Sequence, residues 1–184
     1  EKSSYGPHTL YGCQKLAAEY IVKSHAPKWM IIRPLFAYGG EGDMNSLIAK
    51  SIYACLNGKQ VDMRLDPTKY KDYMHVSDYA NAVLTGITQH LWNDEWNIAA
   101  ETPHVTQNII RMIEKICGLD MSNTINWKPT SDYTGNHRLD STKFRNATGW
   151  SPKVILTKGI RMSYETILNS EGYNPLTHLE EAEK

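Results

Sequence analysis

Apolar residues recur along the chain in short runs and in helical stripes, which predicts alternating strands and helices. Residues 11–24 have the composition of a helix and are bounded by Pro7 and Pro27. The short apolar run at 29–32 ends at Arg33 and Pro34, which is typical of a buried parallel strand. Together this helix and strand predict half of a βαβ unit.

Apolar stripes predict four further helices. Capping residues predict where helices begin and end: Ser77 and Thr106 are expected N-caps, and Gly58 and Gly118 are expected after a last turn. Asp140 is the expected N-cap of an additional short helix. The expected inward residues are Leu47, Ile48, Ser51, Ile52 and Cys55 over 45–57; Ala80, Val83, Ile87 and Leu91 over 77–91; Ile109, Ile110, Ile113, Ile116 and Cys117 after Thr106; and Leu156, Ile160, Tyr164 and Ile167 in a helix from about Thr157.

Short extended segments are expected between these helices, at 59–65, 73–76, 96–99 and 124–127. The residues from Ser170 onward are polar and acidic and are expected to form a frayed tail. Alternation of helices and strands throughout predicts an α/β fold.

Composition narrows the class of protein without identifying it. The 184 residues are 41% hydrophobic and 22% charged, which fits a globular domain and argues against disordered or membrane classes. Lys plus Arg equals Asp plus Glu at 20 each, so net charge gives no reason to expect nucleic acid or a membrane as partner. The three cysteines are odd in number and far apart, which argues against a disulfide framework and favours a reducing, cytoplasmic setting.

Metal binding is not expected. The chain has no H-E-x-x-H or comparable spacing of His, Cys and Asp. His75 stands in an apolar extended segment, and we interpret it as a hydrogen-bonded structural histidine.

One pair of residues has a spacing suited to catalysis. Tyr11 and Lys15 lie at positions i and i+4 of the predicted helix, so their side chains emerge on one face about a turn apart. A phenol is a weak acid, and a neighbouring ammonium group favours its ionised form, which suits a general acid/base. Because tyrosine and lysine are common, a chance pair on a helix is the alternative.

Several sequence blocks place this pair in a family. The helix 11–19 (YGCQKLAAE) is followed by Arg33, Pro34 and the YGG at 38–40. Further blocks follow in order at 71–80 (KDYMHVSDYA), 95–106 (EWNIAAETPHVT) and 140–160, which contains DSTK and GWSPK. In this order they resemble the extended short-chain dehydrogenase/reductase family of nucleotide-sugar epimerases and dehydratases.

The resemblance implies the C-terminal part of a Rossmann-like fold together with a small substrate-binding lobe. The family's G-x-x-G-x-x-G phosphate loop, which precedes the catalytic helix, has no counterpart here, since Gly39, Gly40 and Gly42 follow the strand after that helix. We therefore expect a partial Rossmann segment at 1–58, a substrate-binding lobe interleaved with returning Rossmann elements at 59–170, and a polar tail at 171–184.

The resemblance also implies roles for individual residues. Tyr11 falls on the general acid/base and Lys15 on the residue that holds the cofactor ribose. Pro34 and Leu35 fall beside the nicotinamide of NAD or NADP, although a packing role for this strand end is equally possible. The family's catalytic Ser or Thr lies upstream, and Ser3 and Ser4 are too close to Tyr11 to replace it.

The substrate positions depart from the family pattern. Phe36 stands where the family has an asparagine, and Lys71 replaces an arginine that binds the diphosphate. Lysine supplies charge but not the two-point fork of arginine. A second family arginine corresponds to Arg138 or is replaced by Lys128. These residues are the expected contacts to a nucleotide sugar, with Lys71 and Arg138 converging on one anionic site.

Two function classes follow from these observations. The first is an NAD(P)-dependent epimerase, dehydratase or reductase of which this chain is the C-terminal portion, inactive alone. The second is a non-catalytic relative that keeps the fold as a dimerising or interaction module. For either, we expect a homo-oligomer that uses Leu16, Ala17, Tyr20 and Ile21 of the catalytic helix, and neither a nucleic-acid nor a membrane partner.

Overall fold

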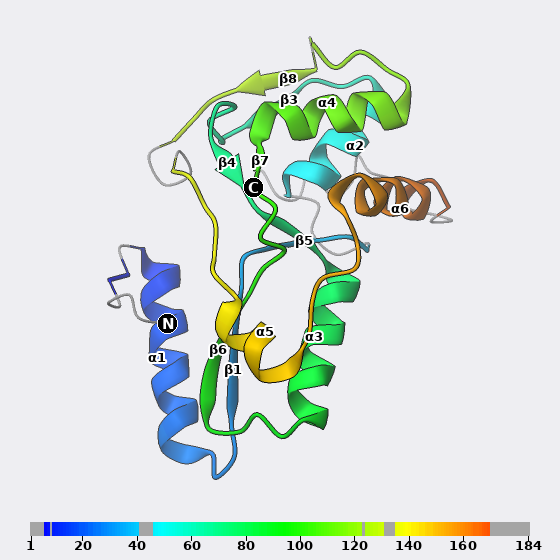
Figure 1. The fold of residues 1–184 in the computed structure, drawn as a ribbon. Helices are drawn as coiled ribbons and strands as arrows, with labels where there is room; N and C mark the ends of the chain where they lie inside the picture. Colours follow the sequence, from blue (N-terminus) through cyan, green and yellow to red (C-terminus); the bar gives the residue numbers. More distant parts are fainter. Residues whose placement is uncertain (1–5, 8, 41–45, 123, 131–134, 170–184) are drawn as a thin grey trace.

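The structure is a computed structural model that describes residues 6–7, 9–40, 46–122, 124–130 and 135–169. Helices and short strands alternate along the chain, which confirms the α/β prediction (Figure 1). The elements are α1 Leu10–His25, β1 Met30–Pro34, β2 Phe36–Tyr38, α2 Leu47–Asn57, β3 Val61–Met63, β4 Tyr70–Lys71, β5 Tyr73–His75, α3 Val76–Thr88, β6 Asp94–Ile98, β7 His104–Val105, α4 Thr106–Cys117, β8 Ile125–Trp127, α5 Thr142–Thr148 and α6 Leu156–Asn169.

The strands of the described residues form two-stranded pairs. β1 and β6 run parallel, in register from Met30 opposite Asp94 to Pro34 opposite Ile98. The pairs β2–β5 and β3–β8 are also parallel, whereas β4 and β7 are antiparallel. Figure 1 shows α1 along one side of β1 and β6 and α3 along the other. The parallel strand predicted at 29–32 is therefore confirmed.

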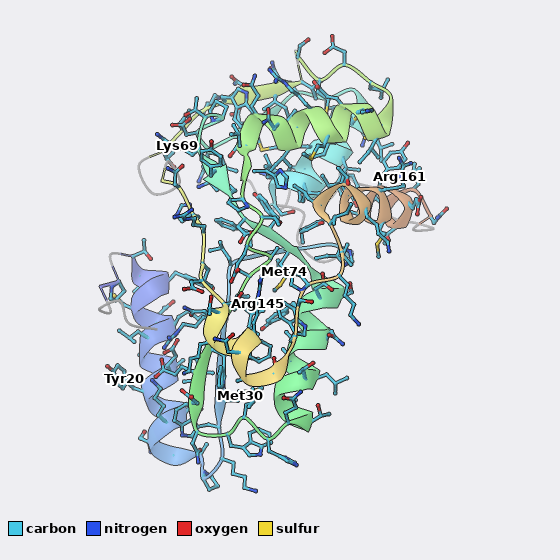
Figure 2. All side chains as sticks on the ribbon, viewed as in Figure 1. Tyr20, Met30, Lys69, Met74, Arg145 and Arg161 are labelled. Atoms are coloured by element: carbon cyan, nitrogen blue, oxygen red, sulfur yellow. The ribbon has the colours of Figure 1, made fainter. Side chains whose placement is uncertain are left out.

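Buried side chains gather into two clusters. The first, which we call the lobe core, joins α2, α4 and α6 with β3 and β8, and its most buried members include Ile52, Ile109 and Ile160. The second, which we call the sheet core, lies around β5, β6 and α5 and includes Met74, labelled in Figure 2, and Phe144. The chain passes between the two regions several times (Figure 1), so neither core is built from one continuous stretch.

The helical stripes of α2 and α6 are confirmed. All five residues predicted to face inward on α2 are buried, and on α6 Leu156, Ile160 and Ile167 are buried. Ser46 caps α2 by accepting a hydrogen bond from the Ala49 N–H, and Gly58 ends the helix in the left-handed conformation that glycine adopts without steric cost.

The predicted caps of three later helices are wrong. α3 is capped by His75, whose side chain accepts from the Ser77 N–H, so Ser77 is not the cap. Thr106 is the first residue of α4, and its hydroxyl donates to the Lys69 carbonyl. Asp140 does accept from the Thr142 N–H, but the cap position of α5 is Ser141. In each case the cap lies one or two residues from the predicted position.

The inner face predicted over 77–91 is only partly confirmed: Val83 and Leu91 are half-buried, and Leu91 lies beyond the end of α3 at Thr88. Ala80 and Ile87 are exposed, and the buried residues of this helix are Asp78, Ala82 and Gly86. Asp78 accepts hydrogen bonds from the backbone N–H groups of residues 153 and 154, which explains how a carboxylate lies inside. On α4 the prediction holds for Ile109, Ile110 and Ile113, while Ile116 and Cys117 are half-buried.

Other predictions concern residues that the structure does not describe. Ser3, Ser4, Gly42 and the tail at 171–184 lie outside the described residues. The division of the chain into domains at residue 58 stays a prediction.

Candidate active site

The first two turns of α1 carry the Tyr11–Lys15 pair. Thr9 caps the helix, since its hydroxyl oxygen accepts a hydrogen bond from the Gly12 N–H at 3.1 Å. One turn further on, the Lys15 Nζ lies 5.4 Å from the centre of the Tyr11 ring. Tyr11 is 69% exposed. The structure therefore brings the two predicted residues together on an accessible surface.

Charged side chains hold α1 against the sheet. The inward side of α1 is only half-buried and includes Leu16, Glu19 and Lys23. The guanidinium of Arg33 on β1 binds the Glu19 carboxylate at two points, with Nε to Oε1 at 2.7 Å. Arg33 and Lys23 both also bind Glu95 on β6. Sequence reasoning missed this network, although Glu19 and Lys23 share the helix face of Leu16.

These ion pairs place the Tyr11–Lys15 pair relative to the strands. Glu19 contacts Arg33, and Lys23, one turn later on α1, contacts Glu95. Glu95 lies opposite Ile31, earlier on β1 than Arg33, so α1 runs antiparallel to β1. Lys15 and Tyr11 therefore extend toward the carboxyl ends of β1 and β6, the edge at which open α/β sheets bind ligands.

Pro34 and Leu35 lie at the same edge. Pro34 is the last residue of β1 and is exposed, and Leu35 is half-buried in the step from β1 to β2. Phe36 begins β2, opposite Tyr73 of β5. The three residues predicted near the cofactor and substrate thus follow one another out of the strand.

A second group of predicted residues surrounds Lys71, and we call it the Lys71 cluster. Lys71 is fully buried, and its Nζ donates to the Gly135 carbonyl at 2.8 Å and lies 2.6 Å from the His137 Nδ1. The Phe36 ring lies 5.7 Å from the Nζ and 5.5 Å from the His137 ring. Sequence reasoning did not identify His137, and only its position next to Arg138 could have drawn attention to it.

Burial is the largest influence on the pKa of both Lys71 and His137. Burial lowers the pKa of Lys71, and the carboxylate of Asp66 opposes this shift. Burial also lowers the pKa of His137, and the positive charge of Lys71 lowers it further. In the neutral tautomer whose Nδ1 carries no proton, His137 can accept a hydrogen bond from the Lys71 Nζ, which accounts for the short contact.

Arg138 is placed differently from Lys71. It is exposed and follows His137, whose backbone N–H donates to the Tyr70 carbonyl. Successive side chains of an extended segment point to opposite sides. The alternative, Lys128, pairs with Asp62 on the β3–β8 surface. The convergence of Lys71 and Arg138 on one anion stays a prediction, and Lys71 would first have to leave its present partners.

His75 has the structural role predicted for it. It is 5% exposed, and its Nδ1 lies 2.8 Å from the Ser77 hydroxyl. Burial lowers its pKa, against the opposing charge of Asp78. Gly39 allows this packing, since its φ is +106° and a Cβ there would lie 2.6 Å from the His75 Nε2.

The described residues contain no group of three or more His, Cys, Asp or Glu side chains placed to hold a metal ion. None of their helices combines the length and the apolarity that crossing a membrane requires.

A cavity of about 200 Å³ lies near the start of α2 and the inner side of α6. Tyr38, Ser46 and Ser163 are among the residues that line it, whereas Tyr11, Lys15 and Lys71 are not. The cavity is therefore distinct from both groups of predicted site residues.

Comparison with known proteins gives consistent matches to sugar-nucleotide enzymes. The dTDP-glucose 4,6-dehydratase of Streptomyces niveus is 24% identical over 189 residues, which cover 99% of this chain and 56% of the relative. The solved dTDP-glucose 4,6-dehydratase of Streptomyces venezuelae superposes with a TM-score of 0.84 at 16% identity, covering 96% of this chain and 56% of that one. The UDP-glucuronic acid 4-epimerase of Bacillus cereus in complex with NAD gives 0.77 at 24% identity, covering 91% and 53%.

These matches define the fold and the family. The solved structures confirm the predicted Rossmann-like fold, and this chain covers about half of each of them. The chain spans about half the length of the curated relatives it matches. The model of the NAD dependent epimerase/dehydratase family matches residues 1–99, more than half of the chain. This chain therefore belongs to the NAD dependent epimerase/dehydratase family.

Proposed function

We propose that the chain is the C-terminal portion of an NAD(P)-dependent nucleotide-sugar epimerase, dehydratase or reductase. The observation that carries this proposal is the Tyr11–Lys15 pair, exposed on one helix face at the carboxyl edge of β1 and β6. Relatives named for dehydratase and epimerase reactions support the class of reaction. They differ among themselves, so the proposal covers the group of reactions.

The residues present fit a nicotinamide cofactor at this edge. Lys15 offers an exposed ammonium group for the ribose hydroxyls, and the exposed Pro34 offers a flat apolar contact for the nicotinamide, continued by Leu35. When bound, the cofactor supplies a hydride acceptor or donor. Tyr11 is placed to take a proton from, or return it to, a sugar hydroxyl, because its phenol is exposed beside the Lys15 ammonium.

The sugar nucleotide is proposed to lie across the loop from Pro34 to Phe36 and toward the Lys71 cluster. Phe36 joins the two regions, since only Leu35 separates it from β1 and its ring contacts both Lys71 and His137. A diphosphate at this place would gain most from Lys71 if the segment at 135–137 moved, because the Lys71 ammonium now bonds to it. Arg138 is the second proposed cation.

The principal test is Tyr11→Phe in a protein that joins this chain to an upstream cofactor-binding half. Loss of a general acid/base lowers kcat by about 100-fold or more. The exposed ring stays in place, so stability should hardly change. Cys13→Ser, an exposed change on the same turn, is the matched control and should keep activity. A loss below about tenfold in Tyr11→Phe would remove Tyr11 from the role.

The chain alone is proposed to bind NAD(H) or NADP(H) weakly or not at all. Its sequence holds no G-x-x-G-x-x-G segment, and such a loop supplies backbone N–H groups to the pyrophosphate. Calorimetric titration measures this directly. A dissociation constant in the low micromolar range would contradict the proposal.

The second candidate is a non-catalytic interaction module, which could use the exposed outer side of α1. Leu10, Tyr20 and Ile21 are 76%, 56% and 61% exposed, and Tyr20 points outward from the helix in Figure 2. Such a surface suits pairing with a second copy in either function, so light scattering should give more than the 20.9 kDa of one chain. Gene sequence upstream of Glu1 separates the two candidates: a phosphate-loop segment favours the enzyme, and an initiator methionine near Glu1 favours the module.

A further inference from the structure

One short segment of the chain covers a buried lysine. Gly135, Asn136 and His137, which we call the strap, lie beside β4 in the part of the chain that leads to α5, drawn yellow in Figure 1. The His137 N–H donates to the Tyr70 carbonyl at 3.0 Å, and the Asn136 side-chain oxygen accepts from the Tyr70 N–H at 2.9 Å. Gly135 and Asn136 are exposed and His137 is half-buried. The strap is therefore an outer segment hydrogen-bonded to β4.

The strap supplies partners that allow Lys71 to stay inside the molecule. Lys71 is 0% exposed, although a lysine is seldom fully buried unless it is paired. Its Nζ donates to the Gly135 carbonyl at 2.8 Å and lies 2.6 Å from the His137 Nδ1. A hydrogen bond at the second contact requires His137 to be the acceptor, because an ammonium group can only donate. Both strap partners are then uncharged, so the strap binds the ammonium group without neutralising its charge.

We propose that the strap closes the anion site at Lys71 and opens when a doubly charged oxyanion, such as sulfate or the diphosphate of a nucleotide sugar, binds while His137 takes up a proton. The inference rests on the anion site of the proposed function and adds its regulation. No surface of Lys71 meets solvent, so an anion can reach the Nζ only in place of the strap. A protonated His137 can only donate at Nδ1, so it repels the ammonium group and releases the strap.

The direction of the proton coupling follows from the two states of the strap. In the closed state burial lowers the pKa of His137, and the positive charge of Lys71 lowers it further. In the open state the ring meets water and lies near an anion, so its pKa returns to the ordinary value of about 6.5 or rises above it. The open state therefore binds the proton more tightly. By reciprocity, the anion binds more tightly as the pH falls.

Two carboxylates near β4 have other partners. Asp66 acts on Lys71 by its charge and raises the pKa of that ammonium group. Hydrogen bonds from Thr68 lower the pKa of Asp66 itself, so it stays ionised at mildly acidic pH. Asp72 follows Lys71 directly, and its carboxylate accepts hydrogen bonds from the backbone N–H groups of residues 101 and 102. Neither carboxylate is bound to the strap by these contacts, so the proposal assigns the proton to His137.

Two further basic side chains lie close to the strap. His104 stands opposite Lys71 on β7, the strand that pairs with β4. Arg138 follows the strap directly, is exposed, and stays charged at every pH of interest. The Phe36 ring, which contacts the His137 ring edge-on, carries no charge. His104 is therefore the group whose titration must be separated from that of His137.

The test is titration of the whole chain with inorganic sulfate, followed by NMR of the His137 ring. Sulfate suits the test because its charge does not change in mildly acidic or neutral solution, so any proton taken up belongs to the protein. Sulfate should raise the pKa of His137. Its dissociation constant should fall by about three- to tenfold between about pH 7.5 and 5.5. Sodium chloride at equal ionic strength is the control for screening and should not shift the titration.

His137→Asn is the decisive variant. An asparagine side chain can offer Lys71 an acceptor oxygen but does not titrate, so sulfate should still bind while its affinity no longer depends on pH. His104→Gln is the matched control, since it removes the other histidine beside β4, and it should keep the full pH dependence. Loss of the pH dependence in His104→Gln, together with its survival in His137→Asn, would overturn the proposal.

Lys71→Met separates this proposal from the proposed function. Sulfate binding that requires Lys71 but has equal affinity at both pH values would overturn the proton-linked strap and leave the anion site in place. Absence of any binding that requires Lys71, at either pH, would overturn the anion site and the strap together. The catalytic role of Tyr11 is decided separately by Tyr11→Phe.

Discussion

Arg33 of β1 and Glu19 of α1 form a two-point ion pair that joins α1 to the sheet. Both side chains are mostly withdrawn from solvent, with exposed fractions of 23% and 17%. Arginine suits this place because its planar guanidinium can meet Glu19 and Glu95 together. The position of Tyr11 relative to the strand edge thus depends on charged contacts two turns along α1.

The first prediction concerns this pair. Arg33→Lys should lower the free energy of unfolding by about 1–3 kcal/mol. A lysine cannot hydrogen-bond to both the Glu19 and the Glu95 carboxylate as arginine does, so these carboxylates would stay withdrawn from water with fewer hydrogen bonds. Urea denaturation measures the change.

The matched control is Asp62→Asn. It breaks the Lys128–Asp62 pair, whose side chains are 59% and 54% exposed, and such a surface pair should contribute nothing measurable. Equal stability of Arg33→Lys and the unaltered chain would show that the two-point contact of Arg33 does not contribute to holding α1.

Helical periodicity predicted some packing correctly, and close contacts explain where it failed. The five residues predicted to face inward on α2, from Leu47 to Cys55, are all buried, because their helical spacing places them on one side of the helix. On α3 the large apolar residues do not mark the buried face, which carries Asp78, Ala82 and Gly86 instead. Small residues face inward there because the helix lies close to β1, and a Cβ at Gly86 would be 2.6 Å from the Met30 Sδ.

The candidate site was predictable only where its residues are near in sequence. Tyr11 and Lys15 share one helix, so their spacing alone placed them together. The contact of Lys71 with His137 depends on how distant segments pair, because the strand-like bridge between residues 71 and 137 forms only in the folded chain. The network around Glu95 was hidden for the same reason, since its partners lie on α1 and β1.

The second prediction concerns pH. Burial lowers the pKa of His75 in the folded chain, whereas an unfolded histidine titrates near its ordinary value of about 6.5. Below that pH the unfolded state binds a proton that folded His75 does not, so stability should fall as pH decreases through this range.

His75→Asn isolates this effect. Asparagine can also cap α3, but it does not titrate. The variant should therefore lose stability less steeply than the unaltered chain between about pH 7 and 5, while His137 keeps its own contribution. Urea midpoints at several pH values give both slopes, and identical slopes would assign the acid sensitivity to other groups.

The third prediction concerns the contact of Gly159 with Tyr38. A Cβ at Gly159 would lie 2.0 Å from the Tyr38 Oη and 2.8 Å from its Cζ, and the ring is buried. Gly159→Ala should destabilise the chain by about 1–3 kcal/mol, although alanine normally stabilises a helix by about 1 kcal/mol relative to glycine. Adding Tyr38→Phe removes the nearest atom and should recover part of the loss. A more stable Gly159→Ala variant would mean that the ring moves freely.

The fourth prediction concerns the Lys71 cluster. The pKa of His137 is lowered by burial first and by the positive charge of Lys71 second. Lys71→Met keeps a chain of similar length but removes the charge, so the pKa of His137 should rise while staying below its ordinary value, because burial remains. NMR titration of the His137 ring measures this.

Lys128→Met removes an exposed ammonium from the neighbouring β8 surface and should leave the His137 titration unchanged. An unchanged titration in Lys71→Met would mean that the ammonium and the imidazole do not meet in solution.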